Sequence, residues 1–484
     1  MFSKLALLAV SATIGPALGE TILGVTVFTR HGDRTSKHFP GYSLTSLGAQ
    51  QNFKVGQDYR GIYLDSGSSK RILGISEDKY VSSQVYASTP DQKILLDATT
   101  AFLQGFYPPL EEVTRLTLAN GSTYSNPLNG YQYIHIHSEP STSPNSIWLK
   151  GDDSCPTYTR ASSSFKSNPE FQQRTEATTP FYARFWDILR NVHDYRPENL
   201  TYANAYDIYD LLNTASIHNA SFAPANHAIS QGISAPDLAR LRTLADSAEF
   251  AANYDVDEPM RSIGGATFAG AVLARLNETV ATRGRRKFSL LAGSYDTFLS
   301  FFGLADLTAG SADFYGLPAY AASMAFEVFT AENVTAFPAV GEVSVRFLFR
   351  NGSDGEALKA FPLFGRKEVA LPWSEFVAEM GKRAITSVRE WCEACESTAE
   401  FCMIYSGPTT IWNPAAYAIS GVISGIIGGT FAVLTILGSK KLGEKARARK
   451  ARKARENDIC LAEMGALNKA GAVERTSSVG GESV

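Results

Sequence analysis

Apolar and polar positions in the first third of the chain follow two different periods. Short β-rich runs, Ile22–Thr29 and Gln84–Ser88, are typical of buried strands. Leu44–Tyr63 and Gln92–Phe106 instead repeat Leu and Phe at a spacing consistent with one apolar face of a helix. Strands that alternate with helices in this way predict an α/β sheet.

The pattern then becomes mostly helical over residues 156–255. The clearest expected helices are Phe181–Val192, Tyr206–Thr214 and Ala235–Ala252, which are punctuated by Pro, Asn and Ser. A helix at Gly265–Leu276 follows. The strands expected after it are Lys287–Ala292, Ala325–Thr330 and Val343–Arg350.

This order predicts an α/β fold made of two chain halves, residues 20–155 and 256–405, with a mainly helical insertion at 156–255 between them. With 484 residues, 44% of them apolar and 19% charged, the chain can bury a sizeable core. Disorder is therefore not expected for the body of the chain.

Both ends of this body carry apolar segments. Residues 1–19 contain an early Lys4, an apolar run Leu5–Ile14 and small residues at Ala17 and Gly19, which is typical of a cleaved secretory signal peptide. A buried first helix is the alternative. Because a strand-like run follows at once, we prefer the signal peptide.

The second apolar segment, 415–437, contains no charged residue and is long enough to cross a bilayer as a transmembrane helix. Trp412 and Tyr417 lie at its outer end, and a basic tail, 438–484, follows it. The positive-inside bias predicts a cytoplasmic tail and a body on the lumenal or extracellular side. A single-pass protein of the secretory pathway is expected.

Glycines recur at helical spacing within this segment, at Gly421, Gly425 and Gly429. Such a stripe can let two transmembrane helices approach closely, so a homodimer is one possible assembly. Glycine is common in transmembrane helices in any case, which is the plainer explanation.

Six Asn-x-Ser/Thr acceptors for N-glycosylation precede the membrane segment, which agrees with this topology. They are Asn120, Asn199, Asn219, Asn277, Asn333 and Asn351.

Four cysteines lie in the body, and in an oxidising compartment they predict two disulfides with three possible connectivities. They are Cys155, Cys392, Cys395 and Cys402. A zinc site at Cys392-x-x-Cys395 is disfavoured because no second close pair or nearby histidine accompanies it. No metal and no cofactor are expected.

Charge is unevenly distributed along the chain. Residues 438–484 carry eleven Lys/Arg and six Asp/Glu, a net charge of +5, which leaves −8 for the rest because the whole chain is −3. A mildly acidic body argues against nucleic acid as its partner.

The candidate chemistry lies directly after the first strand, in the loop Arg30-His31-Gly32-Asp33-Arg34. Ligands gather at the carboxyl ends of strands in open α/β sheets. A neutral imidazole can attack phosphorus, and two arginines offer bidentate donors to phosphate oxygens. A solvated, inert histidine is the alternative, and the rest of the sequence argues against it.

The loop is similar to the motif Arg-His-Gly-x-Arg-x-Pro, and further motifs accompany it over most of residues 20–405. In chain order these are Leu44-Thr45-x-x-Gly48-x-x-Gln51, Gly56-x-x-x-Arg60-x-x-Tyr63, Tyr86-Ala87-Ser88-Thr89, Gly105-Phe106-Tyr107-Pro108-Pro109, Cys155-Pro156 and Pro318-x-Tyr320-Ala321-x-x-x-x-Phe326-Glu327. Together they resemble the histidine acid phosphatases, in the branch that includes fungal phytases. That family's fold is a phosphoglycerate-mutase-like α/β domain with an inserted helical domain.

The resemblance implies that His31 is the nucleophile, that Arg30 and Arg34 hold the phosphate, and that Asp296 is the general acid. The chain departs from the family at three places. Tyr295 replaces the histidine of the family's His-Asp motif, and Ser36 replaces the proline that ends its first motif. Its third phosphate arginine is not evident, with only Gln92 or Lys93 nearby.

Two functions are therefore expected. The first is a membrane-anchored acid phosphatase that hydrolyses small phosphomonoesters through a phosphohistidine. The alternative is a catalytically impaired relative that binds phosphorylated ligands or a partner at the surface. Loss of one preorganised transition-state donor costs about 10²–10³-fold in rate, so both readings are compatible with the substitutions. The remaining histidines, at 38, 135, 137, 193, 218 and 227, are expected to be structural or solvent-exposed.

Overall fold

Strand β1 (Thr21–Arg30) lies in the middle of the sheet and positions the His31 loop at its carboxyl end. The computed structural model describes residues 19–405 except 191, 193–194, 219–231 and 356. β1 pairs in parallel with β6 (Phe288–Gly293) and antiparallel with β7 (Ser323–Thr330). The expected strand Ile22–Thr29 is confirmed, extended by one residue at each end.

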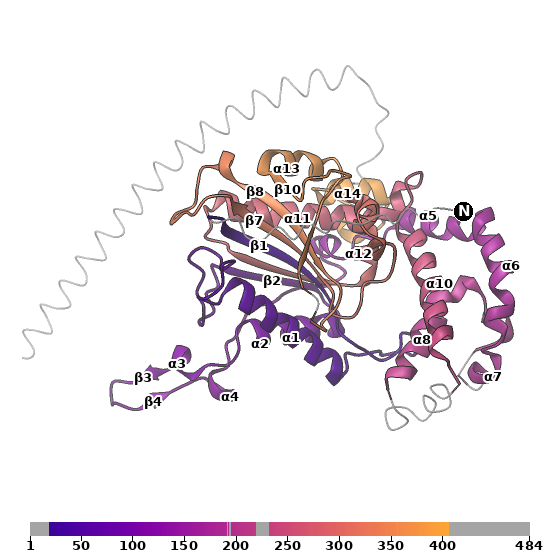
Figure 1. Ribbon diagram of the computed structural model, residues 1–484, viewed down its shortest axis with the longest axis horizontal. Coiled ribbons are helices and arrows are strands. Elements are labelled where there is room, and N and C mark those ends of the chain that lie inside the picture. The colour runs from indigo at the N-terminus through magenta and orange to yellow at the C-terminus, as the bar shows by residue number, and fades with distance from the viewer. Residues whose placement is uncertain (1–18, 191, 193–194, 219–231, 356, 406–484) are drawn as a thin grey trace, which may run out of the picture. The chain divides into compact units, whose positions relative to one another are not determined.

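The eight-stranded sheet has the order β10-β8-β7-β1-β6-β2-β5, with β9 paired to β8 (Figure 1). Its parallel half continues from β6 to β2 (Val85–Pro90) and β5 (His137–Glu139). Its antiparallel half consists of β7, β8, β9 and β10, of which the last three are Ser344–Arg350, Lys359–Phe361 and Ala370–Pro372. A separate hairpin, β3 (Leu116–Thr117) with β4 (Thr123–Tyr124), projects from the body, beside α3 and α4.

Helices cover both faces of the sheet (Figure 1). α1 (Ser46–Tyr63) and α2 (Lys93–Phe106) lie on one face, and their buried side chains cluster with Val25 and Val27 of β1. The other face carries α11, α12 and α13, whose side chains cluster with Phe28. Alternate residues of β1 thus enter opposite cores, as the strand period of two requires. The remaining helices around the sheet are α3 (Glu111–Thr114), α4 (Pro127–Gly130), α11 (Ile263–Ala281), α12 (Tyr295–Leu304), α13 (Trp373–Gly381) and α14 (Val388–Cys395).

Gly56 and Gly105, which belong to two of the sequence motifs, lie where α1 and α2 are in contact. A Cβ atom on Gly56 would lie 2.0 Å from the carbonyl oxygen of Phe102, and one on Gly105 would lie 2.1 Å from that of Phe53. Only glycine permits backbones to approach this closely. The two helices therefore pack as a rigid pair beneath the sheet.

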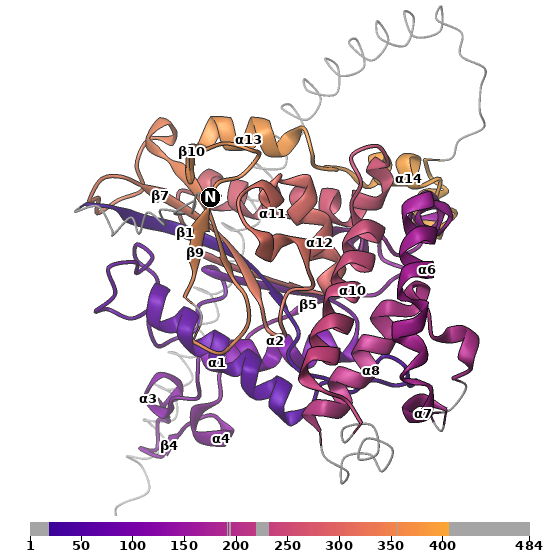
Figure 2. The same cartoon turned by 45° about the vertical axis from the view of Figure 1, so that its right-hand side comes forward.

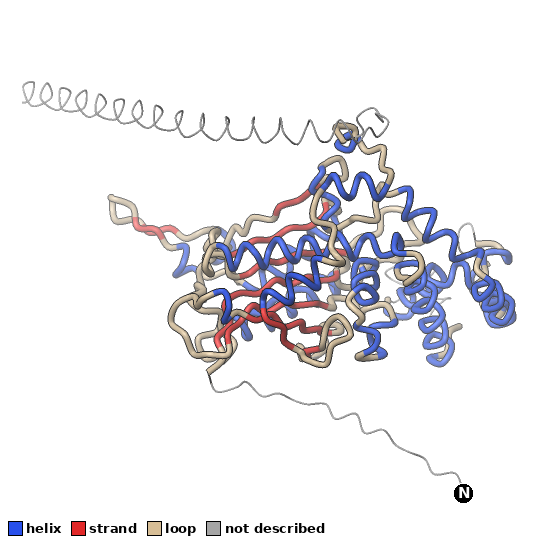
Figure 3. The backbone as a smooth tube through the Cα atoms, turned by 90° about the horizontal axis from the view of Figure 1, so that it is seen from above, coloured by secondary structure: helices blue, strands red, loops and turns tan. Residues whose placement is uncertain are grey.

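Residues 156–255 carry helices and no strand in the part that the structure describes, and they lie to one side of the sheet (Figures 2 and 3). The helices are α5 (Pro156–Ser164), α6 (Pro169–Ala183), α7 (Trp186–Leu189), α8 (Ala205–Ile217) and α10 (Ala235–Asn253). Short 3₁₀ helices occur at Pro144–Trp148, Phe165–Ser167, Pro197–Asn199, Tyr202–Asn204, Pro259–Ser262, Leu307–Ala309, Ala312–Tyr315, Val340–Glu342 and Glu400–Cys402. A mixed α/β fold is confirmed. Contacts group residues 1–406 as one unit, so the boundaries 20–155, 156–255 and 256–405 stay a prediction.

The expected helix Phe181–Val192 is wrong. α6 begins much earlier, at Pro169, and ends at Ala183, after which a separate turn, α7, covers Trp186–Leu189. Phe185 between them has φ −89° and ψ 0°, outside the helical range. Phe181, Phe185 and Leu189 are nevertheless all buried, so the apolar spacing continues where the helical hydrogen bonds do not.

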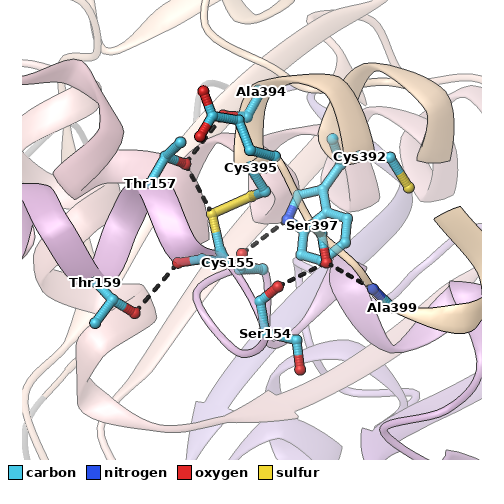
Figure 4. The surroundings of a disulfide bond; sticks show 12 residues. Ser154, Cys155, Thr157, Thr159, Cys392, Ala394, Cys395, Ser397 and Ala399 are labelled. Carbon is cyan, nitrogen blue, oxygen red and sulfur yellow. Dashed lines mark hydrogen bonds between the residues drawn. A yellow bond between two sulfur atoms is a disulfide. The ribbon is translucent and has the colours of Figure 1, made fainter. Parts of the chain in front are cut away.

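Four body cysteines form two disulfides, Cys155–Cys395 and Cys392–Cys402. The first joins the N-terminus of α5 to the C-terminal end of α14, as Figure 4 shows. Two hydrogen bonds reinforce this junction, from Thr157 Oγ1 to the Ala394 carbonyl (2.9 Å) and from Ser397 Oγ to the Ser154 carbonyl (2.8 Å). The structure thus selects one of the three connectivities.

The two disulfides are expected to contribute unequally to stability. A cross-link that closes a longer loop removes more entropy from the unfolded chain. The sequence separations are 240 and 10 residues, which correspond to about 5 and about 3 kcal/mol. The double variant Cys155→Ser/Cys395→Ser should therefore unfold at lower urea concentration than Cys392→Ser/Cys402→Ser. Equal midpoints, or the reverse order, would contradict this.

Several sequence predictions fall outside the described residues. These are the signal peptide (1–19, of which only 19 is described), the transmembrane helix (415–437), the basic tail, the glycine stripe and Asn219. Within residues 19–405, apart from the gaps, no helix is both long and apolar enough to cross a membrane. Of the other glycosylation acceptors, Asn199 is half-buried and four are exposed. The exposed ones are Asn120, Asn277, Asn333 and Asn351.

Candidate active site

The candidate site forms where two parallel strands end side by side. Arg30, the last residue of β1, is paired in register with Gly293, the last residue of β6. His31 follows the first strand, and Tyr295 and Asp296 follow the second at the start of α12. The parallel register thus brings the loop and the Tyr-Asp pair to one edge of the sheet, as expected for ligand sites in open α/β sheets.

The N-terminal part of α1 holds the loop in place. The Gly32 amide donates to Asn52 Oδ1 (2.6 Å), and the Asp33 amide donates to Gln51 Oε1 (2.7 Å). A Cβ atom on Gly32 would lie 2.2 Å from the Gly48 carbonyl oxygen, so only glycine fits there. Gly48 and Gln51 of the sequence motif are therefore spaced so that both contact the backbone of the loop and hold it in place.

The His31 imidazole is buried and neutral. The side chain is 2% exposed, and Nδ1 lies 2.8 Å from the Gly32 carbonyl oxygen. A carbonyl can only accept, so this contact assigns the proton to Nδ1 and leaves the lone pair of Nε2 free. Burial, together with the nearby positive charges of Arg30 and Arg34, holds the pKa of His31 well below its usual value.

Arg30 packs between two aromatic rings. Its guanidinium carbon lies 4.8 Å from the centre of the Tyr320 ring and 5.4 Å from that of Tyr295. Nη1 donates to the Pro318 carbonyl, whereas Nε is buried without a hydrogen-bond partner among the described residues. A buried N–H without an acceptor is costly, so this donor is suited to an anionic ligand.

Arg34 is held by residues of the helical insertion. It forms a bidentate pair with Asp210 of α8, with Nη2–Oδ1 at 2.7 Å and Nη1–Oδ2 at 3.1 Å. Its terminal nitrogens also donate to Tyr206 Oη and to the Thr35 carbonyl, both at 2.8 Å. Nε is again buried without a partner in the described part of the chain. Sequence reasoning missed both Asp210 and Tyr206.

Asp33, inside the loop, is paired with a histidine that the sequence did not connect to it. Asp33 Oδ2 lies 2.8 Å from Nε2 of His218, at the end of α8, and accepts a 2.5 Å hydrogen bond from Thr45. His218 is therefore structural, as expected, but it supports the loop itself. No sequence signal indicated this pairing, because 185 residues separate the partners.

Tyr295, which the sequence resemblance matches to a histidine, supplies no positive charge. Its hydroxyl donates to Glu249 Oε2 of α10 at 2.9 Å, and its ring lies 4.8 Å from that of Tyr206. Burial, together with the neighbouring Glu249, raises the pKa of Tyr295 well above its usual value, so it stays a neutral phenol. Burial also raises the pKa of Glu249, to about 7.

Asp296 is engaged in an ion pair. Its Oδ2 lies 3.1 Å from Lys150 Nζ, and Oδ1 accepts from the Thr297 amide at 2.9 Å. Burial by itself would raise the pKa of Asp296, but the charges of Lys150 and Lys37 outweigh it and the pKa is lowered. Asp152 lies 3.5 Å from the same Lys150 Nζ; burial and the neighbouring Asp296 raise its pKa, although Lys150 opposes them. Protons in such a cluster belong to the carboxyl pair rather than to one residue.

Neither candidate for the third phosphate arginine supplies a charge at the loop. The Lys93 side chain is 79% exposed and pairs with Asp97 on the surface of α2. Gln92, at the N-cap position of α2, is neutral and lines a cavity of about 300 Å³ together with Lys150 and Asp153.

A cavity of about 390 Å³ lies beside the loop, between it and the helical insertion. Arg30, Tyr320 and Gln51 line it from the α/β side, and Asp210 and Arg242 from the helical side. Among the described residues, no group of three or more His, Cys, Asp or Glu side chains could hold a metal ion.

Comparisons with known proteins bear on the family and the fold of the chain. The family model of the histidine phosphatase superfamily (branch 2) matches residues 39–350. No curated protein sequence matches the chain.

Solved structures share the fold at low identity. The phytase of Klebsiella sp. ASR1 has 11% identity and a TM-score of 0.52, with 76% of this chain and 96% of that chain covered. The phytase of Citrobacter braakii has 13% identity and a TM-score of 0.51, over 75% and 98% of the two chains. The Hafnia alvei phytase has 12% identity and a TM-score of 0.50, over 78% and 98%. With its matched region covering well over half of its length, the chain belongs to branch 2 of the histidine phosphatase superfamily.

Proposed function

We propose that this protein hydrolyses small phosphomonoesters through a phosphohistidine formed on His31. One observation carries the proposal: a buried, neutral imidazole with a free Nε2 lies between two arginines. Both guanidinium Nε donors are buried and have no partner among the described residues. A tetrahedral phosphoryl group would accept hydrogen bonds from these donors while Nε2 faces phosphorus.

The reaction has two steps. Nε2 of His31 forms the P–N bond as the ester P–O bond breaks, and the leaving oxygen takes up a proton. Water then attacks phosphorus and returns a proton to the group that protonated the leaving oxygen. The P–N bond breaks, and inorganic phosphate leaves with the neutral histidine regenerated. We propose that the proton comes from the Asp152–Asp296 carboxyl pair beside Lys150, with Asp296 as its acid facing the site.

The full-length chain, purified in detergent, tests this proposal at about pH 5 with p-nitrophenyl phosphate. Mixing with ³²P-labelled substrate followed by an alkaline quench should trap label on the protein, because phosphohistidine survives alkali and is lost in acid. Mapping of the label to the peptide that contains His31 supports the proposal. Turnover without any labelled peptide, or a label on another residue, would contradict it.

The role of Asp296 predicts a dependence on the leaving group. Asp296→Asn should lower kcat/KM by about 10²–10⁴-fold for an alkyl phosphate, whose alkoxide must be protonated. The loss should be much smaller for p-nitrophenyl phosphate, because nitrophenolate leaves without a proton. Asp153→Asn is the matched control, since Asp153 lies 3.6 Å from the same Lys150 Nζ and is 48% exposed. Equal losses for both substrates would contradict the assignment of Asp296 as the acid.

A second candidate function is binding of phosphorylated ligands without turnover. The neutral Tyr295 favours it, as does the lack of a charge from Gln92 or Lys93 at the loop. Tight binding of inorganic phosphate, together with turnover that is indistinguishable from that of His31→Ala, would support this second function. Robust hydrolysis by the unaltered protein would exclude it.

We further propose that the body is a glycosylated ectodomain in the lumen or outside the cell, anchored by residues 415–437. The sequence patterns support this, and the two disulfides are compatible with an oxidising compartment. Removal of N-glycans from membrane fractions should increase the electrophoretic mobility of the chain. An unchanged mobility would contradict the glycosylation. Extraction of the protein from membranes by alkaline carbonate would contradict the anchor at residues 415–437.

A further inference from the structure

Positive charge is scarce in the phosphate site. Arg34 uses its terminal nitrogens on Asp210, Tyr206 and the Thr35 carbonyl. Tyr295 is a neutral phenol, and Lys93 lies on the surface. A phosphoryl group that carries nearly two negative charges is stabilised most by cations held close to it in a water-poor site. Another cation near the loop would therefore alter what the site can do.

Lys37 is such a cation. It lies three residues beyond Arg34, and its backbone amide donates to Asp210 Oδ2 at 2.9 Å. The same carboxylate thus positions both Arg34 and the backbone of Lys37. The side chain is half-buried, and in the described residues no hydrogen bond or ion pair engages its Nζ.

Lys37 and Arg30 both lie near the aromatic ring of Tyr295. Lys37 Nζ lies 4.8 Å from the centre of the Tyr295 ring, and the Arg30 guanidinium carbon lies 5.4 Å from it. Tyr206, which packs against Tyr295, lies 5.7 Å from the same ammonium. Aromatic faces attract cations at such distances, most strongly where water is excluded.

We propose that Lys37 binds the phosphoryl group as the third cation of the site and that the Tyr295 ring positions it. The inference rests on the phosphate site of the proposed function but not on turnover. The substituted tyrosine is then part of the phosphate site: it contributes no charge itself and orients a charge from the loop.

The charges around Lys37 make its contribution dependent on pH. Burial and the positive charges of Arg34, Arg30 and Lys150 together lower the pKa of Lys37 to about 8, against the opposing charge of Asp296. The Glu249 carboxyl also interacts with the Lys37 ammonium. A bound phosphate dianion would raise this pKa. Phosphate affinity should therefore be full below about pH 8 and fall above it, as the free protein loses the Lys37 proton.

Calorimetric titration of the full-length chain with inorganic phosphate, from about pH 6 to 9, tests the inference. Lys37→Met should weaken binding about 10–100-fold at pH 6, the usual worth of a charged hydrogen bond. Lys37→Arg should restore most of the affinity and abolish the extra fall above pH 8, because arginine stays protonated. Lys93→Met, a lysine change on the exposed face of α2, is the matched control and should bind like the unaltered protein.

The ring is tested separately. Tyr295→Leu should weaken phosphate binding more than Tyr295→Phe, and its effect should be smaller in a Lys37→Met background because the two residues act together. Affinity of Lys37→Met within twofold of the unaltered protein at both pH values would overturn the inference. So would equal losses for Phe and Leu at 295, which would assign the effect to the hydroxyl on Glu249.

Failure of this inference and failure of the proposed function have different signatures. Phosphate binding that depends on Lys37, in a protein without turnover, would support the inference and contradict the hydrolase. Turnover whose kcat/KM is unchanged in Lys37→Met would support the hydrolase and contradict the inference about Lys37.

Discussion

His31→Ala is expected to lower kcat/KM for p-nitrophenyl phosphate by about 10³-fold or more at about pH 5, because in the proposed mechanism the covalent intermediate forms on His31. The imidazole is 2% exposed and is surrounded by the loop, so alanine removes the nucleophile without altering a surface. Labelling by ³²P-substrate should disappear in the same variant.

The matched control is His135→Ala, because His135 is exposed and lies beyond the candidate site residues, next to β5. It should retain the full rate. Since the pKa of His31 is held well below its usual value, the unaltered enzyme should also keep a neutral nucleophile at acidic pH. A loss of rate between about pH 6 and 5 that disappears when only Lys37 or Asp296 is changed would be compatible with this expectation. A rate in His31→Ala above one tenth of the normal rate would contradict the assignment of His31 as the nucleophile.

Asp210→Ala is expected to lower the free energy of unfolding by about 3–5 kcal/mol, the usual cost of leaving a buried charge without its partner. Arg34 is fully buried, and the Asp210 carboxylate is its only ion-pair partner among the described residues. The carboxylate also accepts from Ser36 Oγ and the Lys37 amide, both at 2.9 Å. One substitution therefore removes the acceptor of four hydrogen bonds from Arg34, Ser36 and Lys37, whereas the bond from Arg34 to Tyr206 remains.

Urea-induced unfolding with the disulfides intact measures this effect. Asp97→Asn is the control, because it breaks the exposed Lys93–Asp97 pair, and such surface pairs contribute about 0–1 kcal/mol. Asp210→Asn should be intermediate, since an amide keeps an acceptor but loses the charge. A loss below about 1 kcal/mol for Asp210→Ala would show that the Arg34–Asp210 pair does not stabilise the fold.

The fold was largely predictable because its signals are local. The run Ile22–Thr29 is buried on both faces, and the helices that became α1 and α2 repeat their apolar positions at helical spacing. The helix expected at Phe181–Val192 failed because burial of Phe185 and Leu189 continues past the end of α6, and apolar spacing reports burial rather than hydrogen bonding.

The candidate site likewise has a part that local sequence signals predict and a part that depends on contacts between distant residues. The sequence by itself determined the loop from Arg30 to Arg34 and the neutral Tyr295, because these lie in contiguous motifs whose residue types define their chemistry. The hydrogen bonds that attach the loop to α1 came only from the structure. Only the tertiary structure decided that Asp210 neutralises Arg34, that Glu249 accepts from Tyr295, that Lys150 holds Asp296 and that Lys37 lies over Tyr295. The first three contacts join residues 46 to 176 positions apart, and the fourth joins the loop after β1 to the start of α12. Whether such residues meet depends on the order of the strands in the sheet and on how the helical insertion docks on it, which no local period or spacing encodes.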